Sequence, residues 1–187
     1  PPDGDIHTPK YHPGTSSYCE GDTVDVDNLG ATIELQLPVG ETIQGNLMDS
    51  AGVRLNGVRL RAQSTSTNAT RDAWSDEQGY FSVAGLEPGQ AWSLQAAVTG
   101  RPVQWWGETV EQSEASPIAP TENSDIGDWS LMDGVTVEGS IDSYGEPVPD
   151  ATVRVYANSQ VVQATTDEEG FYRATGLPTG DMTAWVA

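Results

Sequence analysis

The strongest constraint on this chain is an internal repeat, because an overlooked repeat would misassign the whole fold. An earlier copy spans residues 45–89 and a later copy spans residues 139–180. Two motifs recur between them: SDEQGYF at 75–81 with TDEEGFY at 166–172, and GLEPG at 85–89 with GLPTG at 176–180. A chain of 187 residues is long enough for one large or two small domains, and the repeat favours two.

The N-terminal residues also align with a later stretch. YHPGTSSYCEGDTVDV at 11–26 aligns with WWGETVEQSEASPIAP at 105–120, and the same offset of about 94 residues carries Gly40 onto Gly134. The Pro, Gly, Asp and Ser content of these residues would by itself indicate a loop. The alignment instead predicts that they are the tail of a further repeat.

This offset divides the chain into three parts. Residues 1–39 are expected to be the C-terminal strands of a preceding or complementing repeat, residues 40–133 a complete repeat, and residues 134–187 the N-terminal strands of a further repeat. Two ways of completing the partial repeats stay open. The missing strands come either from neighbouring repeats of the same polypeptide or from other copies of the chain, joined head to tail.

Alternating apolar and polar residues predict short strands. In ATIELQL at 31–37, Ile33, Leu35 and Leu37 share one face of a half-buried strand. The other strands expected are 41–47, 57–63, 70–75, 80–84, 92–98, 102–110, 125–131, 135–141, 151–157, 161–166, 170–174 and 182–187. Gly79 is expected to adopt a positive φ in a hairpin turn. The predicted fold class is all-β, with tandem antiparallel Greek-key β-sandwich repeats of about 94 residues.

The charge of the chain limits its partners. The formal net charge is −20, with 28 acidic and 8 basic residues. Nucleic acids and anionic membrane surfaces both need a basic surface, so neither is an expected partner. The apolar runs are far shorter than the roughly 20 residues of a membrane-spanning helix, so no membrane span is expected in this segment. Cys19 is the only cysteine, which excludes an intrachain disulfide and favours a free thiol.

The sequence offers few residues for catalysis. A Ser-His-Asp site needs a histidine beside the nucleophile, and the only histidines are His7 and His12 in the N-terminal part. Neither recurs at the matching position of the next repeat, where His12 aligns with Trp106. We therefore expect no enzyme and no cofactor, and we interpret both histidines as solvated loop residues.

Calcium is the metal that the acidic turns suit best, because hard cations bind clustered carboxylate and carbonyl oxygens. The candidate ligands are Asp142, Asp150, Asp167 and Glu168, together with Asp25 and Asp27. None has the spacing of an EF-hand loop, and acidic residues beside glycine are more commonly turn formers. We therefore predict no metal site and keep calcium as the alternative.

Trp105 and Trp106 are the candidate ligand-binding residues among six tryptophans. Adjacent residues of a strand point to opposite faces, so at most one of the two fills the core. The other either packs on a neighbouring domain or is exposed as a stacking platform for a sugar. Packing is the simpler interpretation.

Two stretches carry a family resemblance. GEPVPDATVRVY at 145–156 and TDEEGFYRATGLPTG at 166–180 resemble the carboxypeptidase regulatory-like domain, a transthyretin-like, immunoglobulin-like β-sandwich related to the collagen-adhesin B-type repeats of bacterial surface proteins. The resemblance implies a stalk, spacer or adhesive module that is secreted or displayed at the cell surface. Many collagen-adhesin-type domains carry a Lys–Asn isopeptide bond. Lys10 is the only lysine here, so the repeat at 40–133 cannot form one.

The expected function is therefore a non-enzymatic extracellular structural module. It would be a segment of a tandem-repeat stalk or a building block of a head-to-tail surface filament. Two alternatives stay open. One is an adhesive module that binds a carbohydrate or a protein through Trp105 or Trp106, and the other is an accessory domain of a larger secreted enzyme.

Overall fold

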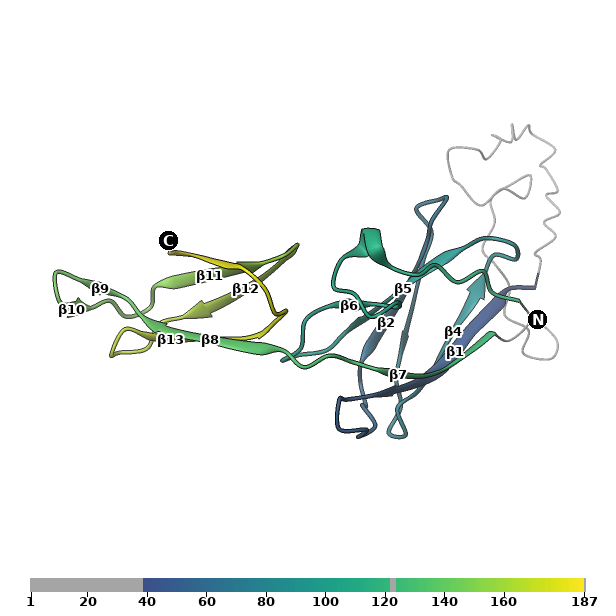
Figure 1. The fold of residues 1–187 in the computed structure, drawn as a ribbon, viewed down its shortest axis with the longest axis horizontal. Coiled ribbons are helices and arrows are strands. Elements are labelled where there is room, and N and C mark those ends of the chain that lie inside the picture. The colour runs from purple at the N-terminus through teal and green to yellow at the C-terminus, as the bar shows by residue number, and fades with distance from the viewer. Residues whose placement is uncertain (1–38, 122–123, 187) are drawn as a thin grey trace, which may run out of the picture.

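The computed structural model describes residues 39–121 and 124–186. Two β-sandwich units follow each other along the long axis of the molecule, and β7 leads through residues 131–134 into β8 (Figure 1). We call residues 39–130 the first unit, residues 131–134 the connection and residues 135–186 the second unit. Each unit has a hydrophobic core of its own. The strand predicted at 31–37, and the partial repeat predicted at 1–39 except for Val39, lie outside the described residues.

The first unit consists of two facing sheets, with strand orders β4-β1-β7 and β3-β2-β5-β6. The strands are β1 (Glu41–Met48), β2 (Arg59–Ser64), β3 (Thr70–Trp74), β4 (Tyr80–Leu86), β5 (Trp92–Ala97), β6 (Gln104–Trp105) and β7 (Ser124–Ser130), with a 3₁₀ helix, η3 (Gln112–Glu114), before β7. The all-β sandwich predicted from the alternating sequence is confirmed.

The same alternation explains how the two sheets pack. Ile43 and Leu47 in β1 are fully buried, while Gln44 and Asn46 beside them are only half-buried. Leu94 in β5 belongs to the opposite sheet and to the same core. The remaining buried members of this core are Val58, Leu60, Ala62, Phe81, Val83, Leu86, Trp92, Ala96, Trp129 and Leu131. Burial of apolar side chains from both sheets holds them together.

One strand pair departs from the antiparallel sandwich that we predicted. β7 pairs with β1 in parallel, with Leu47 beside Trp129 and Met48 beside Ser130. The chain reaches this position only after it has passed through the second sheet, so β7 arrives in the same direction as β1. Alternation shows which face of a strand is buried but says nothing of strand direction, which is why the sequence pattern missed the parallel pair.

The second unit repeats five of these strands. β8 (Val135–Ser140) pairs with β13 (Phe171–Leu177), and the other sheet has the order β12-β11-β14, formed by Gln160–Thr165, Thr152–Ala157 and Met182–Val186. A short hairpin of β9 (Asp142–Ser143) and β10 (Glu146–Pro147), which we did not predict, follows β8. The core residues are Val153, Val155, Ala157, Tyr172, Ala174 and Leu177. Among the described residues after 134, no strand corresponds to β6 or β7.

The repeated motif SDEQGYF/TDEEGFY forms the same turn in both units. Asp76 Oδ1 accepts hydrogen bonds from two backbone N–H groups, at 2.9 Å each, and Asp167 Oδ1 does the same at 3.1 and 2.8 Å. Gly79 has φ +75°, which confirms its predicted role, and Gly170 also has φ +75°. These aspartates bind the backbone of their own turn, as turn-forming residues do.

Candidate functional site

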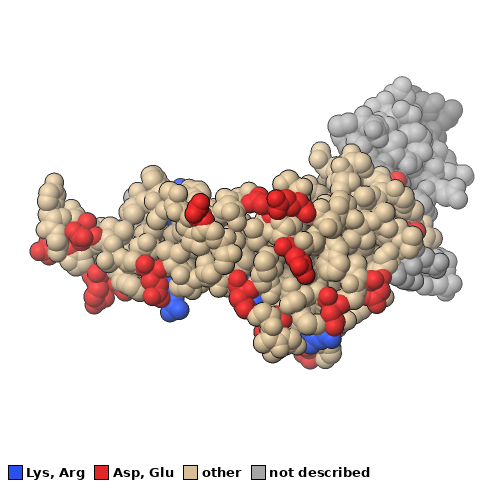
Figure 2. Space-filling model, viewed as in Figure 1, with Lys and Arg blue, Asp and Glu red and all other residues tan. Residues whose placement is uncertain are grey.

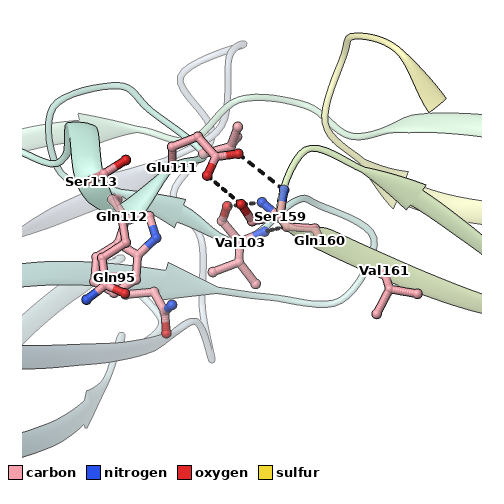
Figure 3. A pocket seen from close by; sticks show the side chains of 10 residues that line it. Gln95, Val103, Glu111, Gln112, Ser113, Ser159, Gln160 and Val161 are labelled. Atoms are coloured by element: carbon pink, nitrogen blue, oxygen red, sulfur yellow. Dashed lines mark hydrogen bonds between the residues drawn. The ribbon is translucent and has the colours of Figure 1, made fainter. Parts of the chain in front are cut away.

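The candidate site lies at the junction, where the first and second units meet. A cavity of about 480 Å³ opens there, lined from the first unit by Gln95, Val103, Trp105, Val110, Glu111, Gln112 and Ser113, and from the second unit by Ser159, Gln160 and Val161 (Figure 3). The second unit reaches it with the turn between β11 and β12. Asn158 takes φ +50° in this turn, a conformation that Asn tolerates better than most residues.

Gln160 binds the backbone of the first unit with its whole side-chain amide. The N–H of Val103 donates to Gln160 Oε1 at 2.8 Å, and Gln160 Nε2 donates to the Val103 carbonyl at 2.7 Å. Both bonds are seen in Figure 3. The backbone N–H and C=O of Val103, just before β6, thus both find their hydrogen-bonding partner in the other unit.

Glu111 forms a second link across the junction. Its Oε2 accepts a hydrogen bond from the Ser159 hydroxyl at 2.6 Å, and its Oε1 accepts one from the Ser159 backbone N–H at 3.2 Å (Figure 3). Hydrogen bonds to a charged acceptor are stronger than neutral ones. Both carboxylate oxygens of Glu111 therefore serve to hold the neighbouring unit.

The connection itself is fixed to the first unit. Gln104, which is buried, accepts a hydrogen bond from the Met132 N–H at 2.7 Å and donates one to the Met132 carbonyl at 3.0 Å. Arg101 binds Asp133 and also approaches Asp49 at 3.8 Å. Hydrogen bonds from Ser50 and Arg101 hold the pKa of Asp133 below its usual value. Side chains of the first unit thus hold residues 132 and 133.

Three glycines make the closest backbone contact of the junction. A Cβ atom on Gly134 would lie 2.5 Å from Gly176 Cα and 2.7 Å from the Gly100 carbonyl oxygen. A Cβ atom on Gly176 would lie 2.9 Å from the Gly100 carbonyl carbon. These distances leave no room for a side chain, so the two units meet backbone to backbone.

The two tryptophans singled out from the sequence lie in different surroundings. Trp105, with 6% of its surface exposed, lines the junction cavity. Trp106 is half-buried and packs edge-on against Trp129, with ring centroids 5.6 Å apart and an interplanar angle of 87°. Trp106 lines a separate cavity of about 340 Å³ together with Gly107, Glu108, Ser116, Asp128, Trp129 and Ser130.

The four acidic residues considered for calcium do not gather into one site. In the part of the chain that the structure describes, no three His, Cys, Asp or Glu side chains form a group that could hold a metal ion. Asp142 accepts a hydrogen bond from the Gly145 N–H at 3.0 Å, and Asp167 binds its own turn. Asp150 takes φ +58° in the loop before β11, and Glu168 is exposed in the turn before β13. Calcium binding at these residues stays the untested alternative, as it does at Asp25 and Asp27, which lie outside the described residues.

Acidic side chains are spread over both units on the face seen in Figure 2, and basic ones are few. No helix in the described ranges is long and apolar enough to cross a membrane. His7, His12 and Cys19 lie outside these ranges.

Sequence reasoning missed the residues that build the junction. Gln104, Glu111 and Gln160 follow no catalytic or metal-binding motif, since each acts on a backbone group far away in the sequence. The one available signal was Gly134, which recurs as Gly40 at the start of the preceding repeat. Glycine permits a close backbone approach, and Gly134 makes one with Gly176.

No family model matches the chain, and a search of the curated proteins finds no match. Among solved structures, the chain is similar to a streptococcal ancillary pilin, with 13% identity and a TM-score of 0.41 over 87% of this chain and 59% of the pilin. It is similar to the dioxygenase domain of a dioxygenase and carbohydrate-binding protein fusion from Streptomyces sp. SirexAA-E, with 20% identity and a TM-score of 0.34 over 50% and 79% of the two chains. The third likeness is to the Bacillus anthracis TIE protein, with 12% identity and a TM-score of 0.33 over 78% and 31%. The chain therefore spans less than two thirds of the pilin, and these values assign no family or activity.

Proposed function

We propose that the chain is a non-enzymatic extracellular structural module, a segment of a stalk or filament in which tandem β-sandwiches act as stiff spacers. The observation that carries the proposal is the junction. Two-domain chains usually move about their linker unless the interface restrains it. Here the linker is short and is held by Gln104 and by the Gly134 contact, while Gln160 and Glu111 join the two units directly.

The restraint is strong because separate contacts hold the connection and join the two units across the cavity. Gln104 fixes Met132 within the connection, and the glycine contact brings backbone against backbone beside it. Gln160 and Glu111 bind across the cavity. A hinge motion would have to break these four hydrogen bonds together, and each is worth about 1 kcal/mol net.

The acidic surface suits this function. A chain with a net charge of −20 stays soluble and repels like-charged neighbours. Such a charge also disfavours binding to nucleic acids and to anionic lipid surfaces. A spacer needs no catalytic group, and among the described residues that line the junction cavity the one carboxylate is that of Glu111, which holds the second unit.

Nitrogen-15 relaxation tests the stiffness, because it reports the rotational correlation time of each unit separately. In the wild-type monomer, both units are expected to fit one shared, anisotropic rotational correlation time. The double variant Glu111→Ala/Gln160→Ala should give two shorter, different correlation times. Gln112→Ala is the matched control, since Gln112 lines the same cavity but bonds to Gln63 within the first unit. Independent tumbling of the wild-type units would contradict the spacer function.

A second candidate function is adhesion to a carbohydrate at the Trp106 cavity. The Trp106 side chain beside Glu108, Ser116 and Asp128 combines apolar and polar groups in a way that suits a sugar ring. Glu108 has φ +60°, a strained conformation of the kind that gathers at binding sites.

A glycan array tests the second candidate. Binding above background, lost in Trp106→Ala but kept in Trp185→Ala, would support it. Trp185 is the matched control because it is half-exposed and lies in the second unit, outside this cavity. An array without binding above background would rule this candidate out. The third candidate, an accessory domain of a larger secreted enzyme, stays a prediction.

A further inference from the structure

Within the described residues, the second unit leaves a core-facing surface uncovered. In β14, Ala184 pairs with Val155 and Val186 pairs with Val153, so both lie on the same side as these buried valines. Ala184 is nevertheless exposed, and Val186 is 40% exposed. The corresponding residues of β5, Leu94 and Ala96, are at most 1% exposed.

β8 shows the same deficit on the other sheet. Val137 and Ile141 are only half-buried, whereas the corresponding residues of β1, Ile43 and Leu47, are fully buried. The neighbouring strand accounts for the difference, because β7 pairs with β1 so closely that a Cβ on Gly45 would lie 2.7 Å from the Gly127 carbonyl oxygen. Gly139 has the place of Gly45 in β8, where the atoms nearest to a Cβ belong to Tyr172 of β13, at 2.8 Å, and no described strand pairs with the other edge of β8.

We propose that this surface is a strand-acceptor site, and that its occupant is the segment 31–37 of a second copy of the chain, bound parallel to β8 where β7 lies on β1. The inference rests on the proposed function and deepens it, since it names the partner at the end of the spacer. Strand addition supplies backbone hydrogen bonds for affinity and alternate side chains for specificity.

The donor is identified by sequence and by the register of β7. In the alignment that places Gly40 on Gly134, Leu35 and Leu37 fall on Trp129 and Leu131, two residues that close the core of the first unit. Trp129 lies beside Leu47. The donor register therefore places Leu35 beside Ile141.

A second donor strand follows from the same alignment. β6 extends the sheet of β5 by pairing Trp105 with Gln95 and Gln104 with Ala96. Tyr11 aligns with Trp105. The free edge of β14 would therefore receive Tyr11 beside Trp185.

The segment cannot reach this site in its own chain. Leu37 is two residues from Val39, so it lies within about 7 Å of it. Val39 precedes β1, whereas the second unit follows the far end of the parallel β1–β7 pair. The 8 residues of β1 span about 26 Å, which exceeds the reach of Leu37. The contact is thus between copies, and being head-to-tail it does not close but builds a fibre.

Light scattering after size exclusion tests the proposal with two variants of the full chain. Leu35→Asp damages the donor, and Val186→Asp damages the acceptor at a side chain that is already 40% exposed. The mass of the wild-type species should rise above 19.9 kDa as the concentration increases, while the mass of each variant alone stays near 19.9 kDa. A mixture of the two should stop at a 1:1 dimer, because one variant keeps its acceptor and the other keeps its donor.

Each copy carries a net charge of −20, so the measurement is made at about 0.15 M and at about 1 M NaCl, where the Debye length falls from about 8 to about 3 Å. Association should strengthen at the higher salt. A wild-type mass of 19.9 kDa under both conditions would overturn the proposal and assign the surface to another occupant, such as a following segment of a longer chain. The relaxation measurement would still report stiffness in that case, so the two proposals fail separately.

A cysteine pair tests the register independently of folding defects. In a Cys19→Ser background, Glu34→Cys on one chain and Ser140→Cys on another should form an interchain disulfide, because Asp128 and Asn46 pair at the corresponding positions of β7 and β1. Thr136→Cys on the same strand is the matched control. Equal cross-linking of both acceptor positions would contradict the assigned register.

Discussion

β5 and β14 occupy the same place in the two units, yet only β5 is buried. Each is paired in register with the second strand of its unit, β2 or β11. Four of the six residues of β5 are buried, whereas four of the five residues of β14 are exposed. Hydrogen-bonded pairing within a sheet therefore does not by itself bury a strand. In the first unit the burial of β5 also needs β6 and β7, which have no counterpart among the described strands of the second unit. The two units therefore share five strands and differ in whether β6 and β7 are present to complete the sandwich.

The largest loss of stability should come from truncating a core side chain of the first unit. Leu94→Ala removes a fully buried side chain and should lower the free energy of unfolding of the first unit by about 2–5 kcal/mol. Val186 is 40% exposed and lies two residues from Ala184, which corresponds to Leu94. At a concentration where the chain is monomeric, Val186→Ala should change the free energy of unfolding of the second unit by no more than about 0.5 kcal/mol. Amide hydrogen exchange measured unit by unit gives both values. Equal losses would mean that β14 is covered in solution.

A change at the junction should have the next largest effect. Gly134→Val would place a side chain 2.5 Å from Gly176 Cα, so backbone must shift, at a cost of about 1–3 kcal/mol. The two units should then tumble separately while the cores of both remain intact. Thr136→Val, an exposed site in the adjacent strand, is the control. Unchanged relaxation in Gly134→Val would show that the glycine contact does not hold the units.

The smallest effect concerns pH. Hydrogen bonds from Arg61 and Arg59 lower the pKa of Asp72 from 3.8 to about 2. A lowered pKa means that the ionised form is stabilised by folding, so the contribution is present above about pH 4 and is lost as the pH falls through about 2. Since the pair lies at the surface, it is worth at most about 1 kcal/mol.

Asp72→Asn should therefore weaken the first unit near pH 5 and make no difference near pH 2, which acid titration of the unfolding free energy can follow. The second unit provides the comparison, because Arg154, in the place of Arg61, faces Gln163 in register and stacks on Trp185 at 5.6 Å. A Gln163→Ala variant should show no such pH dependence. A difference that persists at the lowest pH would contradict the ion-pair explanation.

Alternation in the sequence was enough to predict most strands and the Asp-Glu-x-Gly turn, because both depend on local patterns. It failed at 102–110, where only Gln104 and Trp105 form a strand. Gly107 and Glu108 have φ +109° and +60°, and they turn the chain back so that Trp105 bonds with Thr109. The direction of β7 and the bonds of Gln160 also escaped prediction, since both depend on partners more than 50 residues away.

For the candidate site, strand geometry predicted that Trp105 and Trp106 would lie in different surroundings, while ligand binding by either one stays a prediction. What the pattern could not give was the function of the polar residues beside it. Gln104 and Gln160 resemble ordinary surface residues in sequence. Each of them has a structural function because its side-chain amide bonds to the backbone of a distant element, and the local sequence pattern does not show which backbone lies there.

The parallel pairing of β1 with β7 has a mechanical consequence. Because the two strands run in the same direction, the chain enters the first unit at one end of this ladder and leaves it at the other. A pull along the chain then shears the ladder, loading its evenly spaced hydrogen bonds together, whereas an antiparallel pair joined at a hairpin would open one bond at a time. Forced unfolding is governed by the unfolding barrier, so β1 and β7 would set the tension that such a spacer withstands.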